Sequence, residues 1–278
     1  MPVNKLSAAL CLLSLLTVEG CSNNPVIPVE TQVVLRGYLY ANQPVQDIQL
    51  ASSVSILSSD TSDPPITNAS VVLLKGSSSY QLAPNPAQPG FYYYPGSDLS
   101  VDVGDEFQIR VDAEGQVVTA ETAVPTKPLG ASLSANVMRF QRDTIVTRFG
   151  TTRVSVTGLD TETVSWTNSS GDYFYITVES TDSTRQLLRG DSVVTRFLGR
   201  FTSEPTNQSS YRVNNNIFQY TGGYLLRLYH VNNEYANLYR SRDQDSRTLN
   251  EPLTNVKNGL GVFSAFASDS LSCSVVVQ

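Results

Sequence analysis

The sequence predicts an all-β protein built from two β-sandwich domains, with one short helix in the second domain. Short runs rich in Val, Ile, Tyr, Phe and Thr recur along the chain, separated by Gly, Pro, Asn and Asp. The 278-residue chain is long enough for two domains. Its three cysteines are too few for a disulfide framework, so the core must be held together by packing.

The first domain is expected over residues 31–125. Its alternating runs predict about seven strands, the number found in an immunoglobulin-like sandwich. These strands are expected at residues 32–40, 48–56, 69–74, 79–82, 90–94, 106–113 and 116–123. Two prolines bracket the polar residues at 124–128 and remove backbone donors there, which predicts a linker to the second domain.

The second domain is expected over residues 126–278. A strand that carries Trp166, a polar turn and then a Tyr-rich strand are typical of a fibronectin-like sandwich. Tyr235, Leu238 and Tyr239 are spaced i, i+3 and i+4, which predicts a short amphipathic helix near 233–242 that packs on this sandwich. Strands are expected at 131–140, 145–149, 152–157, 164–166, 171–178, 192–201, 217–220, 224–231, 261–267 and 273–277.

Residues 1–20 have the pattern of a signal peptide. Lys5 precedes an apolar run at 6–18, which is shorter than the roughly 18 residues that span a bilayer. Val18-Glu19-Gly20-Cys21 then resembles the lipobox of bacterial lipoproteins, although Glu19 is unusual in it. We expect cleavage before Cys21, lipidation of Cys21 with two or three acyl chains of the palmitate type, and a tether at 21–30. The alternative is an ordinary secretory signal that ends near a cysteine.

The charge pattern predicts no nucleic-acid partner. The net charge is −6, and Lys and Arg form no cluster along the sequence. Contact with a membrane is therefore expected only through the N-terminal lipid.

No set of residues predicts catalysis or metal binding, so we expect a protein that is not an enzyme and has no cofactor. His230 is the only histidine and has no thiolate partner for zinc; we expect it to be a satisfied strand residue. Cys273 lies in an apolar strand and is expected to be a core thiol. A hydrolase would need two carboxylates to converge, and turn chemistry explains the candidate pairs equally well. These pairs are Asp60 with Asp63, Asp102 with Asp105, Asp160 with Glu162, and Asp243 with Asp245.

Tyr92, Tyr93 and Tyr94 form a candidate binding surface. Together with Phe91 they place aromatic rings on both faces of one expected strand. One face must belong to the core, and the other is free to contact a ligand or partner. The alternative is ordinary aromatic packing across neighbouring strands.

Two parts of the chain resemble known families. Residues 33–39 and 66–74, followed by Pro89-Gly90-Phe91-Tyr92, resemble a carboxypeptidase-regulatory-like or transthyretin-like sandwich. Tyr239 and residues 250–266 resemble the closing motif of uncharacterised, domain-of-unknown-function outer-membrane lipoproteins of Bacteroidota. In that motif, Asn258-Gly259 predicts a turn, and Gly261 leaves room for a close backbone approach at the start of a buried strand.

The second resemblance implies location and partners. Such lipoproteins accompany TonB-dependent outer-membrane receptors, so the resemblance implies a non-enzymatic accessory or binding component of such a receptor or of another envelope complex. The alternative is a surface lipoprotein that binds glycans or nutrients. Ser22-Asn23-Asn24 lacks the acidic residues that usually follow the cysteine in surface-exported members, which leaves the membrane leaflet open.

Overall fold

A computed structural model describes residues 31–54, 63–146, 148–150, 152–182, 186–188, 200–242 and 254–278. The expected signal peptide, Cys21 and its tether lie outside these residues. The first half of the chain forms β1 (Val33–Tyr40), β2 (Asp47–Ser52), β3 (Ser70–Lys75), β4 (Ser78–Pro84), β5 (Phe91–Tyr93), β6 (Glu106–Ala113) and β7 (Gln116–Ala123). All seven strands expected in this half are confirmed, with shifts of a few residues at their ends.

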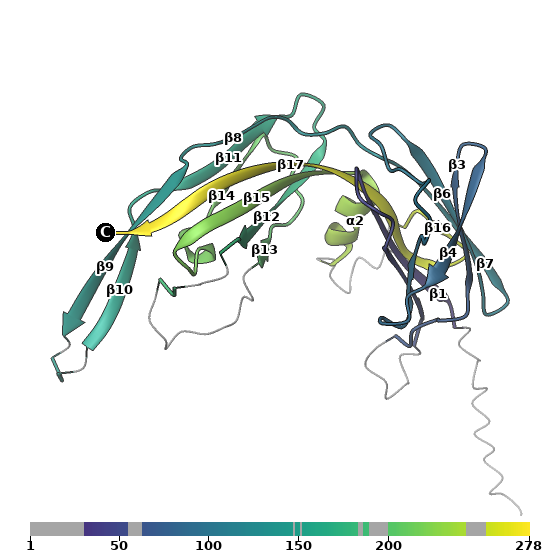
Figure 1. Ribbon diagram of the computed structural model, residues 1–278, viewed down its shortest axis with the longest axis horizontal. Coiled ribbons are helices and arrows are strands. Elements are labelled where there is room, and N and C mark those ends of the chain that lie inside the picture. Colours follow the sequence, from purple (N-terminus) through teal and green to yellow (C-terminus); the bar gives the residue numbers. More distant parts are fainter. Residues whose placement is uncertain are drawn as a thin grey trace, which may run out of the picture. The chain divides into compact units, whose positions relative to one another are not determined.

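The second half is also mostly β. It forms β8 (Leu129–Leu133), β9 (Val137–Val146), β10 (Thr152–Gly158), β11 (Glu162–Thr167), β12 (Tyr173–Ser180), β13 (Arg200–Thr202), β14 (Ser210–Val213), the 3₁₀ helix η1 (Asn215–Ile217), β15 (Gly222–Val231), α2 (Asn233–Arg242), β16 (Val256–Lys257) and β17 (Leu260–Val277). The expected all-β sandwich class with one short α-helix is confirmed (Figure 1).

Hydrogen bonding joins most of these strands into one sheet. Within the described residues, fourteen strands form a continuous sheet whose main path runs β13-β12-β15-β17-β1-β2-β5-β4-β3-β6-β7-β16. Strand β9 pairs with β17 and with β10, and a separate three-stranded sheet has the order β14-β11-β8.

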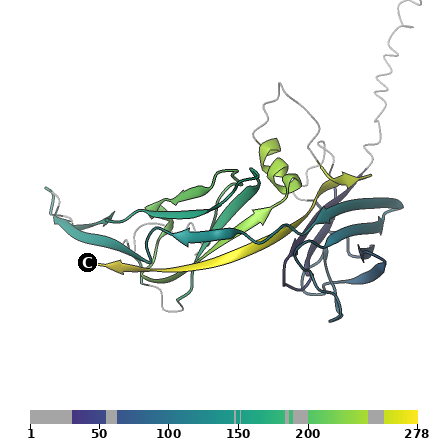
Figure 2. The ribbon, with the colours of Figure 1, turned by 90° about the horizontal axis from the view of Figure 1, so that it is seen from above.

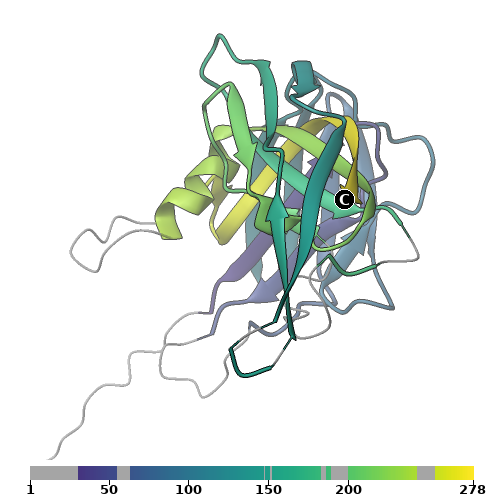
Figure 3. The same ribbon diagram turned by 90° about the vertical axis from the view of Figure 1, so that its left-hand side faces the viewer.

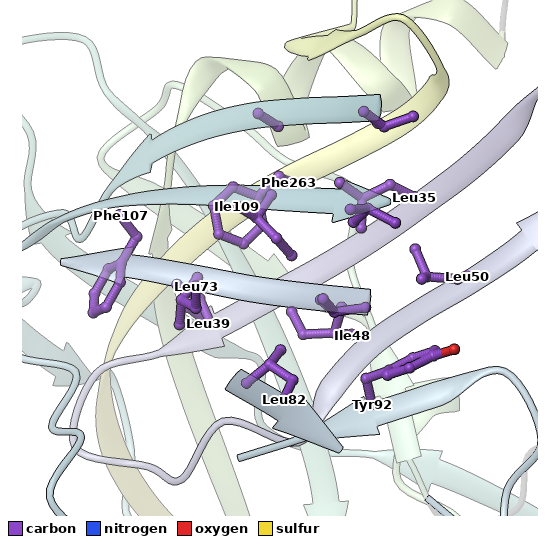
Figure 4. Close-up of a cluster of buried hydrophobic side chains, with 14 of the residues drawn as sticks. Leu35, Leu39, Ile48, Leu50, Leu73, Leu82, Tyr92, Phe107, Ile109 and Phe263 are labelled. Atoms are coloured by element: carbon purple, nitrogen blue, oxygen red, sulfur yellow. The ribbon is translucent and has the colours of Figure 1, made fainter. Parts of the chain in front are cut away.

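A first core lies between β17-β1-β2-β5 and β3-β6-β7, which face each other because β4 joins the two halves. Leu35, Ile48, Ile109 and Phe263 are among its fully buried side chains, and Figure 4 shows them meeting from different strands. They alternate with exposed residues along their strands, as expected for strands with one face in a core.

A second core lies between the other part of the large sheet and the three-stranded sheet. Trp166 from β11 packs on Phe174 from β12, with ring centroids 5.5 Å apart. The Trp followed by a Tyr-rich strand therefore belongs to a sandwich, as predicted.

The last strand, β17, contributes to both cores. Its first residues pair in parallel with β1, and the residues from Phe266 to Val275 pair antiparallel with β15. Phe263 belongs to the first core and Cys273 to the second. Figure 2 shows this strand, in yellow, running without interruption. The domain boundary expected at 125 and 126 stays a prediction, because residues from Thr31 to Gln278 form one unit.

The two separate strands expected at 261–267 and 273–277 are one strand. The polar stretch Ser268-Asp269-Ser270 predicts a break by its composition, but it pairs with Tyr229, Leu228 and Arg227 of β15. Its small polar side chains lie at the partly exposed part of the strand, where they need no core. At about 3.3 Å per residue, 18 residues span about 60 Å.

The expected strand at 131–140 is instead two strands in different sheets. Strand β8 pairs with β11, whereas β9 pairs with β17. The break lies at Ser134, whose backbone N–H and hydroxyl both donate to the buried Oε1 of Glu162, at 2.9 and 3.0 Å. A tertiary contact therefore bends the chain where the local pattern predicts continuous extension.

Two other expectations in this half differ from the structure. The strand expected at 217–220 is preceded by η1, whose N-cap Asn214 accepts a hydrogen bond from the Asn216 N–H. This local capping competes with strand pairing. Of the strand expected at 192–201, residues 192–199 lie outside the described residues, and β13 begins at Arg200.

The closing motif forms a hairpin that completes the first core. Asn258 adopts a left-handed backbone (φ 58°) in the turn between β16 and β17. The Asn255 side chain donates to the carbonyls of Phe263 and Glu121, at 2.6 and 2.8 Å, and accepts from the Phe263 N–H. At Gly261 a Cβ would lie 1.9 Å from the Leu35 carbonyl oxygen, so the predicted close approach is confirmed. Residues 250–253 of the motif lie outside the described residues.

Candidate functional site

The three tyrosines predicted as a binding surface do not act together. Tyr92 is fully buried in the first core; its hydroxyl donates to the Ile66 carbonyl and accepts from the Ala69 N–H. Strand β5 turns alternate side chains to opposite faces, and Tyr92 points inward. Tyr92 is therefore a core residue and not part of a binding surface.

Tyr94 is also turned toward the core. Its ring packs edge-on against Tyr80, and its hydroxyl donates to Asp98, a bond that raises the Tyr94 pKa. Tyr93 is half-buried on the opposite face of β5, together with Phe91. That face carries the candidate site.

This site is a set of aromatic rings on the face of the large sheet that points away from both cores. We call it the tyrosine face and define it as Tyr38 and Tyr40 of β1, Tyr173 and Tyr175 of β12, Tyr229 of β15 and Phe266 of β17. Sheet order places these four strands side by side. The strand pairing brings together aromatic residues from both halves of the sequence.

The rings of the tyrosine face pack on one another across the strands. Tyr175 and Tyr229 are paired in register and stack with centroids 4.7 Å apart. Tyr40 stacks on Phe266 at 5.1 Å and meets Tyr229 edge-on at 6.2 Å. Such aromatic pairs are each worth about 0.5–1.5 kcal/mol beyond their burial, so the face is a rigid surface.

Helix α2 lies against one end of the tyrosine face. Tyr235 meets Phe266, Tyr175 and Tyr38 at centroid distances of 4.9, 5.6 and 5.9 Å. Its hydroxyl is 3.4 Å from that of Tyr239. Figure 3 shows α2 to one side of the strands. The predicted Tyr-rich helix face thus packs on the sheet, and it contacts β1 as well as the strands of the second half.

The hydroxyls of the tyrosine face are neutral and available. Burial raises the pKa values of Tyr40 and Tyr175 well above the ordinary 10, so both stay protonated. In the described part of the chain the hydroxyls of Tyr40, Tyr175 and Tyr229 have no hydrogen-bond partner and are not enclosed. Arg200 lies close enough to Tyr40 and Tyr175 to influence both hydroxyls electrostatically. The face therefore offers apolar rings with polar atoms at their rims.

A hollow of about 350 Å³ adjoins the tyrosine face at Tyr40. It lies between the loop that follows β1, the start of β2 and the loop before β5. Tyr40 and Phe91 provide aromatic walls, and Asp47 provides a carboxylate. Four amide side chains complete most of its lining: Gln43, Gln46, Asn85 and Gln88. We call it the Asp47 hollow.

His230 has a structural position. Its Nδ1 lies 2.7 Å from the Thr126 carbonyl oxygen, and its ring stacks on Phe174 at 4.7 Å. It thereby holds the segment at 124–128 against β15. This confirms the expectation of a satisfied strand histidine.

Cys273 is a buried core thiol, as expected. Burial raises the pKa of its thiol to about 12, which leaves it protonated and unreactive at neutral pH.

The candidate carboxylate pairs have separate partners. Asp102 and Asp105 both lie near Lys75 Nζ, at 3.8 and 2.6 Å. Asp160 forms a two-pronged pair with Arg139, whose hydrogen bonds lower the Asp160 pKa to about 2. Asp63 pairs with Arg36, while Asp60, Asp243 and Asp245 lie outside the described residues. Among the described residues, no group of three or more His, Cys, Asp or Glu side chains is placed to hold a metal ion.

Fold and site together define an all-β sandwich protein with a tyrosine-rich sheet face. The chain belongs to the family described as Domain of unknown function (DUF4249), whose model matches residues 23–272. No curated protein matches the sequence. In the described part of the chain, helices fall short of the length and apolarity needed to cross a membrane.

Solved structures with some likeness come from multidomain chains. The chain is 12% identical to the FN1-FN3 domains of chicken CNTN1, with a TM-score of 0.28, over 73% of this chain and 60% of that one. It is 10% identical to domains A168-A170 of titin, with a TM-score of 0.21, over 88% and 66% of the two chains. The chain thus spans about two thirds or less of the length of these two structures.

Proposed function

We propose that this protein is a non-enzymatic lipoprotein of the bacterial outer membrane that binds another envelope protein through its tyrosine face. The tyrosine face is the observation that carries the proposal. A TonB-dependent receptor is the partner suggested by the resemblance of the closing motif, and the membership in a family of unknown function is consistent with it.

The composition of the face supports protein binding. Tyrosine is enriched in protein interfaces because its ring contributes apolar contact and its hydroxyl contributes a hydrogen bond at little cost in conformational entropy. Here the rings are held by strands and by stacking, so binding would order few side chains. The hydroxyls of Tyr40, Tyr175 and Tyr229 are free to bond to a partner.

The anchor is tested by Cys21→Ala. The lipid is expected to hold the protein in the membrane fraction, since two or three acyl chains bind a bilayer far more firmly than one. The variant should move to the soluble fraction in a cell-fractionation blot. Cys273→Ala is the matched control, because Cys273 is a buried core thiol and should leave the protein in the membrane. Retention of the Cys21 variant in the membrane would contradict the lipid anchor.

The binding face is tested by replacing three hydroxyls without removing the rings. The triple variant Tyr40→Phe, Tyr175→Phe and Tyr229→Phe should recover at least about tenfold less partner, since each lost hydrogen bond is worth about 0.5–1.5 kcal/mol. The measurement is affinity purification from membranes through a C-terminal tag, followed by quantitative mass spectrometry.

The control for this experiment is Tyr94→Phe. It also removes one tyrosine hydroxyl, but from a side chain that bonds to Asp98 and packs toward the first core. It should recover as much partner as the unaltered protein. Two results would refute the proposal: the unaltered protein recovers no TonB-dependent receptor or other outer-membrane protein, or the triple variant recovers as much as the control.

A further inference from the structure

Asp47 is a half-buried carboxylate without a protein donor. It lies at the start of β2, opposite Tyr38 in the register of β1 and β2, and it lines the Asp47 hollow. No described residue forms an ion pair or hydrogen bond with it. Burial raises its pKa above the ordinary 3.8. A carboxylate that has lost water and gained no donor is a costly arrangement, which a ligand with donor groups would relieve.

The other walls of the hollow narrow the chemistry of that ligand. The side chains of Gln46 and Gln88 each offer donors and an acceptor, so a matching ligand must both accept and donate hydrogen bonds. Among the described residues that line the hollow, none is Lys or Arg, which disfavours an anion. The hollow also lacks the several oxygen ligands from carboxylates that a bound Ca²⁺ would need.

The aromatic walls favour a ligand with apolar faces. Phe91 lies on the face of β5 opposite to Tyr92, and Tyr40 is held in place by its stacking on Phe266. Sugar rings combine these properties, because their hydroxyls donate and accept while their C–H faces are apolar. The volume of about 350 Å³ is at the lower end of the range of about 300–1,000 Å³ for small-molecule sites.

We propose that the Asp47 hollow binds a neutral saccharide, whose hydroxyls donate to the Asp47 carboxylate and whose C–H face rests against Tyr40 and Phe91. This proposal stands independently of the protein partner proposed above. It differs from the sequence-based candidate, because Phe91 takes part and Tyr92 and Tyr94 do not.

The test is a calorimetric titration of the purified full-length protein in detergent. The probes are neutral oligosaccharides of glucose, xylose, mannose and galactose, each at about 1 mM and above, where weak binding is still measurable. We expect at least one of them to bind. Asp47→Asn keeps the size of the side chain but removes the charged acceptor, and should weaken binding at least about tenfold.

Three further measurements make the outcome decisive. Thermal unfolding checks that Asp47→Asn is folded, and Asp98→Asn, which changes a carboxylate bound to Tyr94, should leave the affinity unchanged. The double variant Tyr175→Phe, Tyr229→Phe should also leave it unchanged, which separates this site from the proposed protein interface. The inference is overturned when no neutral saccharide binds, when Asp47→Asn binds as well as the unaltered protein, or when butylamine binds and the saccharides do not.

Discussion

Gly261→Ala is expected to lower the free energy of unfolding by about 3 kcal/mol or more, mostly by disrupting the pairing of β1 with β17. Gly261 has φ +110°, a region that L side chains rarely adopt. Its new Cβ would also lie 1.9 Å from the Leu35 carbonyl oxygen, and Leu35 is its partner in the parallel ladder. Because that oxygen belongs to the backbone, the strand itself must move.

Urea unfolding followed by circular dichroism measures this effect. Gly104→Ala is the matched control, since Gly104 also has a positive φ (+87°) but a Cβ there would meet nothing within 4 Å. It should show the backbone strain alone, about 1 kcal/mol. Equal losses in the two variants would show that the close approach of β17 to β1 contributes nothing.

Phe266→Ala is expected to cost about 3–5 kcal/mol of stability, the range for deleting a buried aromatic ring. Phe266 is 1% exposed and lies at the centre of the tyrosine face. Its ring contacts those of Tyr38, Tyr40, Tyr175 and Tyr235, so the deletion leaves a cavity that strands β1 and β12 and helix α2 all share. We therefore expect α2 to lose its packing on the sheet.

The readouts are chemical unfolding and hydrogen exchange of the α2 amides, which should become faster in the variant. Phe149→Ala is the control: Phe149 is 92% exposed, and its removal should leave stability unchanged within about 0.5 kcal/mol. Unchanged exchange in α2 would refute the inference that Phe266 holds the helix in place.

Much of the local structure follows from the sequence. The alternation in 106–113 and 116–123 predicts β6 and β7 with their observed ends, because each strand has one face in a core and one toward solvent. The Tyr and Leu spacing predicts α2, and Asn258-Gly259 predicts the turn before β17. The need for glycine at 261 also follows from the motif.

The candidate site was harder to predict. Period-two alternation indicates that only one of the two faces of β5 can be exposed, but it does not say which. The structure decides that Tyr92 points into the core while Phe91 and Tyr93 point away from it. No sequence signal links Asp47 to Tyr40 and Asn85, since the hollow depends on where three separate segments meet.

The sequence by itself therefore determined the β class, the single α-helix and the turn at Asn258, because strand alternation, helical spacing and turn chemistry are local properties of the chain. Only the tertiary structure decided that β17 runs through both cores and that Ser134 breaks a strand on the carboxylate of Glu162. Only it gathered Tyr40, Tyr175 and Phe266 on one face. Partners for strands and buried groups come from distant parts of the sequence, and the pattern around each residue does not identify them.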